Sequence, residues 1–344
     1  MNTIDRPFIR PELLAILACP VCKSSDLKSI VSEAPQLCCG SCGTSYGFNN
    51  GIPLLYKNDF AWAPKQREAE GWVEMWKDIG LYKDEQPIWV DIPFGATTEP
   101  WITMEQMFRA ALFQMDLRGG EKVLDIGAGE GWASQQFAGR GAHAVAIDVV
   151  PDGKLGLGRA WKRMEFTGAP FDLMIGDNEN LPFEPDSFDI VFASNALHHH
   201  DHLDKLFSNI YRVLKPGGRL ISIGEPLITI YQRESDTTDG DRERAFGIIE
   251  RRRRFYHYIL ALWQAGFRNI HADDHKTFWK NNADLYAWMD IERYAIEEHT
   301  ILGSKQLTKL LTRIMLRLPR PFAVWLLLCL RQQGTLLLNV QKPL

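Results

Sequence analysis

Apolar runs of the length of buried strands alternate with amphipathic stretches from residue 121 to the end of the chain. Residues 121–126 (EKVLDI) have the pattern of a short buried strand, and residues 132–140 have a helical pattern. Further strands are predicted at 143–148, 171–177, 188–197, 215–226, from about 267, and at 334–344, with a helix at 201–214. Strands that alternate with helices are typical of an α/β fold with a largely parallel sheet.

Length and composition narrow the class of protein. The chain has 344 residues, of which 45% are hydrophobic, so it can bury the core of one large domain or of two unequal ones. Its formal net charge is −4, which does not favour nucleic acid as a partner. Residues 1–17 lack the features of a secretory signal. The longest apolar run, 322–330, is shorter than the roughly 20 residues that a spanning helix needs. We therefore expect a cytoplasmic protein.

Five of the six cysteines lie in one N-terminal segment. Two C-x-x-C pairs, Cys19 with Cys22 and Cys39 with Cys42, are separated by sixteen residues. This spacing is typical of a structural zinc site with four thiolate ligands. A pair that started at Cys38 would end at a serine, so Cys39 is the expected ligand. A redox pair or a chance cluster is the alternative interpretation.

The sequence around these cysteines, LLAILACPVC followed by LCCGSCGTSYGFNNGIPLLY, resembles a family of small zinc ribbons. Proteins of that family act as separate subunits that activate several methyltransferases. The resemblance covers residues 12–56 and rests on the L-L-x-x-L-x-C-P-x-C and G-I-P-x-L elements. It implies an N-terminal zinc-ribbon domain over residues 1–57 that holds a structural Zn²⁺ ion.

Three glycines at alternate positions, Gly127, Gly129 and Gly131, join the first predicted strand to its helix. A strand, a glycine turn and a helix together indicate a nucleotide site, because small residues let the backbone approach the ligand. A dinucleotide fingerprint would have glycine where this chain has Trp132. Asp125 precedes the glycines, and a carboxylate suits a cofactor that carries positive charge.

The resulting D-x-G-x-G-x-G pattern resembles the first motif of class I S-adenosylmethionine-dependent methyltransferases with a type 11-like methyltransferase domain. The likeness covers about residues 119–226. It implies a seven-stranded Rossmann-like sheet with helices on both faces. It also places Asp148 at the ribose and Asp177 near the adenine of the cofactor. The cofactor-binding residues implied in this way are Asp125, Gly127, Gly129, Gly131, Asp148, Asp177, Asn178 and Asn195.

Polar residues after the fourth and fifth strands are candidates for the methyl-transfer site. His198 and His199 follow the fourth strand, and Glu225 follows the fifth. Transfer to oxygen needs a base near neutral pH, a role that suits histidine. In the other interpretation the two histidines are packing residues, and Glu225 either binds substrate or faces solvent. Residues 200–202 (HDH) either cap the next helix or form a metal pair, and we expect the cap for Asp201.

The remaining segments are expected to flank the cofactor domain. A Trp-rich segment at 58–118 is predicted to be a helical cap over the cofactor cleft, and residues 119–344 form the methyltransferase domain with an insertion at about 275–333. A helix at 304–318 has a leucine-rich face and a basic stripe of Lys305, Lys309, Arg313 and Arg317. This helix is either a docked lid or, with the apolar run after it, a peripheral contact with the inner face of the membrane through residues 305–330.

These features predict an S-adenosylmethionine-dependent methyltransferase that acts on a small-molecule, saccharide or lipid-linked acceptor such as a glycolipid, most readily at oxygen. The basic run at 251–254 would then either meet an acceptor phosphate or lie in solvent. One alternative is an RNA or protein methyltransferase with a fused zinc-ribbon activator, although residues 194–197 (SNAL) are not an amine-binding N-P-P-Y tetrad. Another is a binding protein that keeps the fold without catalysis. The sequence indicates no oligomeric state.

Overall fold

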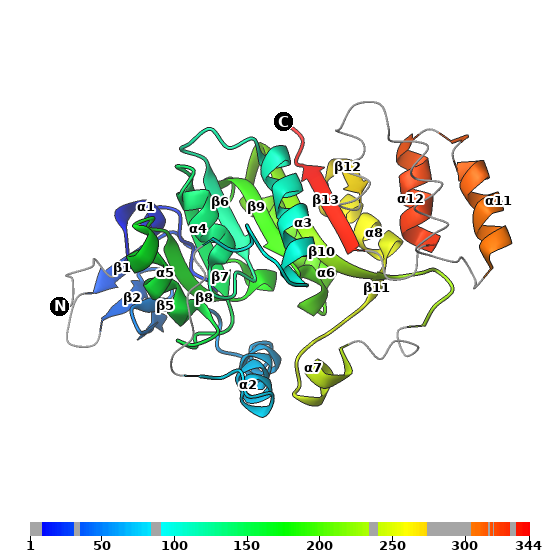
Figure 1. Ribbon diagram of the computed structural model, residues 1–344. Helices are drawn as coiled ribbons and strands as arrows, with labels where there is room; N and C mark the ends of the chain where they lie inside the picture. Colours follow the sequence, from blue (N-terminus) through cyan, green and yellow to red (C-terminus); the bar gives the residue numbers. More distant parts are fainter. Residues whose placement is uncertain are drawn as a thin grey trace.

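A mixed β-sheet forms the centre of the protein (Figure 1). The computed structural model describes residues 9–30, 35–83, 91–233, 240–273, 304–315, 317–318, 320–330 and 335–344. Within these residues the sheet has ten strands, of which β11 (Arg253–Arg254) pairs with the end of β10. The other nine lie side by side in the order β12 (Arg268–Asp273), β13 (Thr335–Gln341), β10 (Leu214–Ile228), β9 (Phe188–Ser194), β6 (Lys122–Ile126), β7 (His143–Asp148), β8 (Asp172–Gly176), β5 (Ile52–Leu55) and β4 (Phe48–Asn49).

Seven of these strands form the expected Rossmann-like sheet. β6 to β10 run parallel to one another, whereas β13 lies antiparallel between β10 and β12. The prediction of an α/β fold with this sheet is therefore confirmed. The strand order reverses between β6 and β9, and the crevice outside such a point is where open α/β sheets bind ligands.

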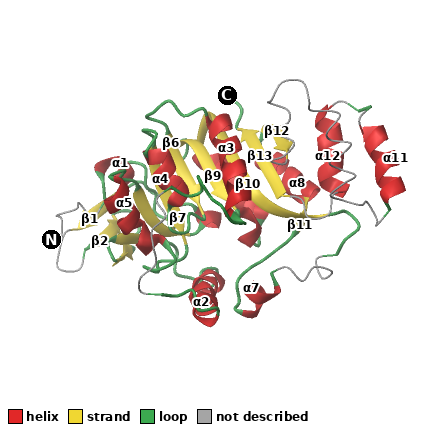
Figure 2. Ribbon diagram, in the orientation of Figure 1, coloured by secondary structure: helices red, strands yellow, loops and turns green. Residues whose placement is uncertain are grey.

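Helices cover both faces of the sheet (Figure 2). Alternation along β9 separates two apolar layers: Ile190 and Phe192 face one layer, while Val191 and Ala193 face the other. The first layer includes α3 (Trp101–Met115), α4 (Trp132–Ala138) and α5 (Ala160–Thr167), and the second includes α6 (Leu203–Val213), α8 (Phe255–Ala265) and α12 (Arg320–Leu330).

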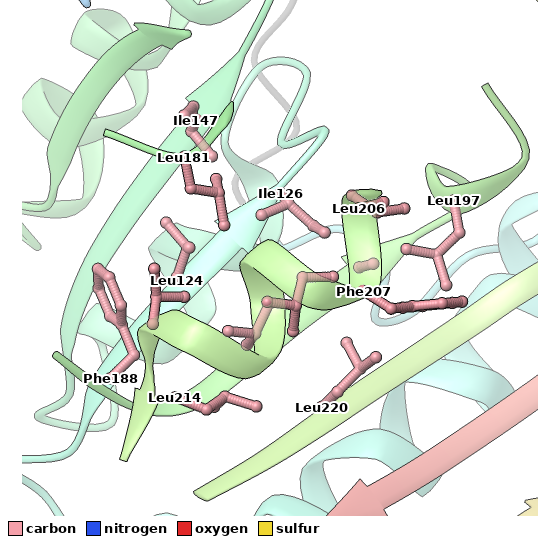
Figure 3. Close-up of a cluster of buried hydrophobic side chains, with 14 of the residues drawn as sticks. Leu124, Ile126, Ile147, Leu181, Phe188, Leu197, Leu206, Phe207, Leu214 and Leu220 are labelled. Carbon is pink, nitrogen blue, oxygen red and sulfur yellow. The ribbon is translucent and has the colours of Figure 1, made fainter. Parts of the chain in front are cut away.

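The second layer contains a cluster of fully buried side chains between α6 and the sheet. Figure 3 shows Leu206 and Phe207 of α6 in one cluster with Leu124 and Ile126 of β6. All four side chains are fully buried. The helix predicted at 201–214 therefore stabilises the same strand that leads into the glycine loop, and burial of each such side chain contributes about 1.5–3 kcal/mol.

The cysteine-rich segment packs directly on the sheet. It contains α1 (Pro11–Leu14) and a small antiparallel sheet of β1 (Leu27–Ile30), β2 (Gln36–Cys39) and β3 (Ser45–Tyr46). Its buried Leu17 belongs to the same apolar cluster as Phe183, and the two residues form an isolated β-bridge. Arg10 donates a hydrogen bond of 2.6 Å to the carboxylate of Asp172 at the start of β8.

Residues 48–55, which were expected within the zinc ribbon, extend the central sheet. Leu54 and Leu55 of β5 pair in parallel with Ile175 and Gly176 of β8, and β4 pairs with β5. The strand added to β8 thus comes from a segment that precedes β6 by more than sixty residues. The two parts share one continuous sheet.

Two helices lie next to each other beyond the carboxyl ends of the strands: α2 (Ala63–Asp78) and the short α7 (Asp241–Ala245) (Figure 1). In the predicted insertion at 275–333, only α11 (Lys305–Met315), residues 304 and 317–318, and α12 belong to the described residues. α12 packs on α8 and β12, and α11 lies against α12 at the end of the molecule (Figure 1). None of the described helices has the length and apolarity needed to cross a bilayer.

Candidate functional site

A cavity of about 820 Å³ lies at the carboxyl ends of the central strands. Its walls come from the loops that follow β6, β7, β8 and β9 and from the bend in β10. α2 closes one side with Lys65, Glu68, Trp72 and Trp76. Cavities that hold small ligands typically measure about 300–1,000 Å³, so this space can take a cofactor together with part of a second molecule.

The glycine loop forms one wall of the cavity through Gly127 and Gly129. Gly127 has φ 64°, and a Cβ atom there would lie 2.5 Å from the Cβ of Ala196 in the loop after β9. Gly129 has φ 55° and faces open space, because a Cβ atom built there meets nothing within 4 Å. A side chain at position 129 would occupy the space that the backbone leaves for a ligand.

Two residues of the motif support the loop from outside the cavity. Gly131 lies at the N-terminus of α4 with φ 77°, and a Cβ atom there would be 2.8 Å from the ring of Phe171. Asp125 is buried under the loop, where its Oδ2 accepts hydrogen bonds from the backbone N–H and the hydroxyl of Ser134 at 3.1 and 2.7 Å. Neither residue lines the cavity. The sequence predicted that both residues bind the cofactor. In the structure Asp125 binds Ser134, and the backbone at Gly131 lies close to the ring of Phe171.

Burial raises the pKa of Asp125 to about 7, although the hydrogen bonds from Ser134 act in the opposite direction. The nearby carboxylate of Asp148 also contributes to this raised pKa. Burial also raises the pKa of Asp148 above its usual value. The strand ends under the cavity therefore carry two buried carboxyl groups.

The other predicted cofactor residues line the cavity. Asp148 accepts hydrogen bonds from the backbone N–H of Gly129 at 2.9 Å and of Val150 at 2.8 Å. Asp177 forms an ion pair with Lys65 at 3.1 Å. Asn178 is only 5% exposed, and its Oδ1 has no hydrogen-bond partner among the described residues. A buried amide oxygen without a partner fits a ligand that donates a hydrogen bond, as an adenine amino group does.

Asn195 lines the cavity at the end of β9. It has φ 49°, and its side-chain amide lies where a Cβ atom at Gly224 would be, so only glycine fits at position 224. The backbone N–H of Asn195 donates to Ile223 at 2.9 Å. This pairing of β9 with β10 brings the loop after β9 over the bend of β10.

Glu225 is fully buried and holds the loop after β9. Its carboxylate accepts backbone hydrogen bonds from Ala196, Leu197 and His198 at 3.0–3.1 Å, and it lies 2.9 Å from Nδ1 of His198. The alternative in which Glu225 faces solvent is therefore wrong. Glu225 does not line the cavity, so it positions His198, which does.

His198 and His199 each lie close to a glutamate that belongs to no recognisable sequence motif. Nε2 of His198 is 3.3 Å from Oε2 of Glu250, and Nδ1 of His199 is 3.1 Å from Oε1 of Glu68. Burial lowers the pKa of His198, but its hydrogen bonds with Glu225 and Glu250 outweigh burial and raise the pKa to about 9. Sequence reasoning found both histidines and missed both carboxylates, which come from α2 and from the segment before β11.

The polar residues after His199 do not have the roles that the sequence indicated. Asp201 is not the N-cap residue of α6, which is His202, and its carboxylate accepts a hydrogen bond from Arg251 at 2.6 Å. His200 is buried, its Nδ1 lies 3.1 Å from the carbonyl of Ala196, and burial lowers its pKa to about 3. Arg253 donates to the carbonyl of His200 and Arg254 to that of Gln232. Three arginines of the basic run therefore bind the protein itself, and the fourth, Arg252, lines the cavity.

The four predicted thiol ligands lie together. Sγ of Cys19 is 3.7 Å from that of Cys42, Sγ of Cys22 is 3.5 Å from that of Cys39, and all four sulfurs lie within 4.8 Å of one another. Bonds of about 2.3 Å to one zinc ion would place the sulfurs of a tetrahedral site about 3.8 Å apart. Cys38 instead faces the hydroxyl of Ser45 at 3.2 Å. The donor set therefore fits zinc.

Comparisons with known proteins match the central part of the chain. Residues 124–222 match the family model described as a methyltransferase domain. The phthiotriol/phenolphthiotriol dimycocerosates methyltransferase of Mycobacterium tuberculosis is 31% identical over 137 residues, which are 40% of this chain and 48% of that protein. The chain thus spans about half the length of this relative.

Two further proteins extend the comparison. The demethylmenaquinone methyltransferase of Clavibacter sepedonicus is 30% identical over 187 residues, which are 52% of this chain and 68% of that protein. Among solved structures, phosphoethanolamine N-methyltransferase 2 of Haemonchus contortus in complex with S-adenosyl-L-methionine aligns with 81% of this chain and 57% of its own, with 19% identity and a TM-score of 0.46.

Proposed function

Because the chain belongs to the S-adenosylmethionine-dependent methyltransferases, we propose that it transfers the methyl group of this cofactor to a hydroxyl oxygen of a small-molecule, saccharide or lipid-linked acceptor. Relatives named for phthiotriol dimycocerosates and for demethylmenaquinone support an acceptor of this kind. RNA, protein and non-catalytic binding are the alternatives that a test of activity has to separate.

The proposal rests on one observation: residues that fit the cofactor and residues that can bind an acceptor line the same cavity. Gly129, Asp148 and Asn178 line the part that fits the cofactor, and His198 and His199 line the same space. Binding both reactants in one cavity aligns them and removes much of the entropic cost of their meeting. The imidazole and carboxylate groups can hydrogen-bond an acceptor hydroxyl, which favours oxygen as the methylated atom.

The charge of the cavity suits the cofactor. When bound, S-adenosylmethionine supplies an electrophilic methyl group on a positively charged sulfur. The cations that line the cavity are Lys65, Arg252 and His198, whose pKa is raised to about 9. Five acidic side chains line it as well: Glu68, Asp148, Asp177, Glu243 and Glu250. Such an excess of carboxyl groups favours a cationic ligand over an anionic one. Trp72 and Trp76 add apolar surface for the body of an acceptor.

For the cysteine cluster we propose a structural Zn²⁺ ion. The spacing of Cys19, Cys22, Cys39 and Cys42 in the sequence and the distances between their sulfurs support it. Four protein ligands would leave no position for water or substrate, so the ion would stabilise the fold and take no part in the transfer.

A peripheral membrane contact through residues 305–330 is proposed from the surface of α11 and the residues after it. Leu310, Ile314 and Phe322 are exposed apolar residues, and Arg313 and Arg317 are exposed as well. Apolar and basic side chains together are typical of helices that lie on anionic lipid. The variant Arg313→Glu/Arg317→Glu should float less with anionic vesicles than the wild type, and equal flotation of the two proteins would end this proposal.

The function is tested in two steps. Isothermal titration calorimetry of the zinc-loaded protein with S-adenosylmethionine should show one site per chain, and a protein that does not bind the cofactor would end the enzyme proposal. Mass spectrometry then follows the replacement of one hydrogen by a methyl group across a panel of quinones, glycolipids, saccharides, RNA and peptides. Methylation of RNA or peptide alone would overturn the proposed acceptor class.

A further inference from the structure

Three side chains of the cavity wall converge on one point: His198, His199 and Glu250, here called the His–His–Glu cluster. Nε2 of His198 lies 3.3 Å and Nε2 of His199 lies 4.0 Å from the same Oε2 of Glu250. One ligand atom from each residue lies within 4.8 Å of the others. All three residues line the cavity, and their side chains are at most 18% exposed.

The other nitrogen of each imidazole is already engaged. Nδ1 of His198 lies 2.9 Å from the buried carboxylate of Glu225. Nδ1 of His199 lies against the carbonyl of Ile249 and 3.1 Å from Glu68. Since these partners only accept hydrogen bonds, both Nδ1 atoms carry a proton, and in neutral imidazoles the lone pairs of both Nε2 atoms face Glu250.

Two nitrogen lone pairs and a carboxylate oxygen at one point repel each other unless positive charge lies between them. Protons on the imidazoles are one source of that charge, and a metal ion is the other. Histidines that bind metals usually donate their second N–H to a carboxylate or a backbone carbonyl, which is what both imidazoles do in this cluster. Ligands about 2.1 Å from one ion lie about 3.0–3.4 Å apart, close to the first of the two distances.

We propose that His198, His199 and Glu250 bind a divalent transition-metal ion in the wall of the cavity. Two imidazoles and one carboxylate suit Zn²⁺, Mn²⁺ or Fe²⁺, whereas Mg²⁺ and Ca²⁺ prefer oxygen ligands alone. Three protein ligands leave coordination positions open, and the open side faces the cavity. This site is separate from the four-cysteine cluster.

The ligand expected at the open positions is an oxygen of the acceptor. A metal ion lowers the pKa of a hydroxyl group bound to it, so the oxygen becomes a better nucleophile at neutral pH. The released proton passes to solvent or to a cavity carboxylate, and the methyl group forms its new bond to oxygen as its bond to sulfur breaks. This role rests on the proposed function, whereas binding of the ion does not.

Metal binding is tested with the full-length protein, without any acceptor. The metal-free protein is first given one equivalent of Zn²⁺ to fill the thiolate site. It is then titrated with Mn²⁺, whose unbound form is counted by electron paramagnetic resonance, and in parallel with a second equivalent of Zn²⁺, which is measured by metal analysis after gel filtration. We expect one additional ion per chain.

Variants assign the ion to the cluster. His198→Gln, His199→Gln and Glu250→Gln should each weaken binding of the additional ion by more than about 100-fold, and Glu68→Gln by about 10- to 100-fold. The matched control is His202→Gln, which removes an exposed histidine of the same loop and should bind the ion as the wild type does. Circular dichroism and S-adenosylmethionine affinity show whether each variant folds.

Two results would overturn the proposal. One is a wild-type protein that takes up neither ion beyond the first Zn²⁺. The other is an additional ion that the three cluster variants bind as tightly as the wild type. Failure of the proposed function gives another result. A protein that binds the additional ion but methylates no compound of the panel would support the metal site and contradict the proposed acceptor class.

Discussion

At the scale of single residues, Glu225 illustrates how one buried carboxylate fixes the position of a loop. Three backbone N–H groups and one imidazole converge on it, so the loop after β9 has its position fixed by β10. His198, which lines the cavity, is therefore positioned by a residue that does not line it.

Replacement of Glu225 should destabilise the whole chain. In Glu225→Gln the amide can accept fewer of these hydrogen bonds and leaves donors unpaired in the core, which should lower the free energy of unfolding by about 3 kcal/mol. Urea unfolding measures the change. Glu165→Gln, an exposed carboxylate on α5, is the control and should stay within about 0.5 kcal/mol of the wild type.

Gly129→Ala should weaken the binding of S-adenosylmethionine at least about tenfold, or 1.4 kcal/mol, because the added methyl group enters the cavity. Calorimetry measures the affinity. Gly168→Ala is a control matched for backbone strain, since Gly168 has φ 66° and also faces open space, but away from the cavity. Equal losses of affinity in both variants would show that backbone strain is the cause and not the cavity.

Asp125 should make the cofactor-free protein less stable as the pH rises. Its pKa is raised from 3.8 to about 7 in the folded state, so between these values the folded chain keeps a proton that the unfolded chain has released. The stability from this carboxyl is complete below about pH 3.8 and is lost as the pH rises through about 7.

Asp125→Asn removes this titration, so the stability difference between variant and wild type should shift in favour of the variant from pH 5 to pH 8. Thermal unfolding at several pH values without cofactor measures it. Parallel profiles for the two proteins would contradict the assignment of the proton to Asp125.

At the scale of elements, the sequence predicts where strands occur better than it predicts which strands pair. β6, β7, β8 and β9 coincide with apolar runs bounded by glycine or acidic residues, so a local pattern suffices to predict them. β4 and β5 have only two and four residues, and Pro53 lies within β5. The place of β5 beside β8 depends on a partner strand more than one hundred residues away, which no local pattern encodes.

Residues of the site that lie at strand ends could be predicted from the sequence, whereas those that depend on packing between distant segments could not. Asp148 ends β7, and Asp177 and Asn195 directly follow β8 and β9. These parallel strands were predicted from the sequence, so topology alone brings the three residues to one edge of the sheet. Glu68 and Glu250 lie on a helix and a loop without a motif. Their contact with the histidines depends on how α2 docks, which is a matter of packing between distant segments.

The docking of α2 rests on Gly71. A Cβ atom at this position would lie 2.2 Å from the carbonyl oxygen of Phe246, so the helix approaches the segment after α7 as closely as the backbone allows. Helix propensity alone predicts that Gly71→Ala stabilises the protein by about 1 kcal/mol. We expect the opposite sign, a loss of about 1–3 kcal/mol, because the backbone oxygen cannot move aside easily.

Urea unfolding decides the sign for Gly71→Ala, and a stabilised variant would show that α2 does not pack against Phe246 in solution. Glu70→Ala serves as the control on the same helix, because the neighbouring Glu70 is exposed and its replacement removes no contact with the segment after α7.

At the scale of the whole molecule, the cysteine-rich segment and the central sheet should unfold together. Leu17, Leu37 and Tyr46 belong to the same apolar cluster as Phe183 and Leu124, and β5 pairs with β8. Loss of the proposed zinc ion should therefore lower the melting temperature of the entire chain in a single transition.

Cys22→Ser, or a chelator added to the wild type, tests this coupling by differential scanning calorimetry. Cys38→Ser is the control, because Cys38 lies outside the sulfur cluster and faces Ser45. Two separate transitions in the zinc-depleted protein, with the second at the temperature of the wild type, would contradict the coupling.

Because β5 belongs to the same chain as the rest of the sheet, its pairing with β8 should not depend on the protein concentration. The zinc-ribbon family that this segment resembles works as separate subunits, and any such complex dissociates as its concentration falls. In this chain the strand that completes the edge at β8 is tethered, so its local concentration is set by the length of the linker and not by the amount of protein in solution. The edge next to Asp177 and Asn178 should therefore stay covered by β5 at nanomolar dilution.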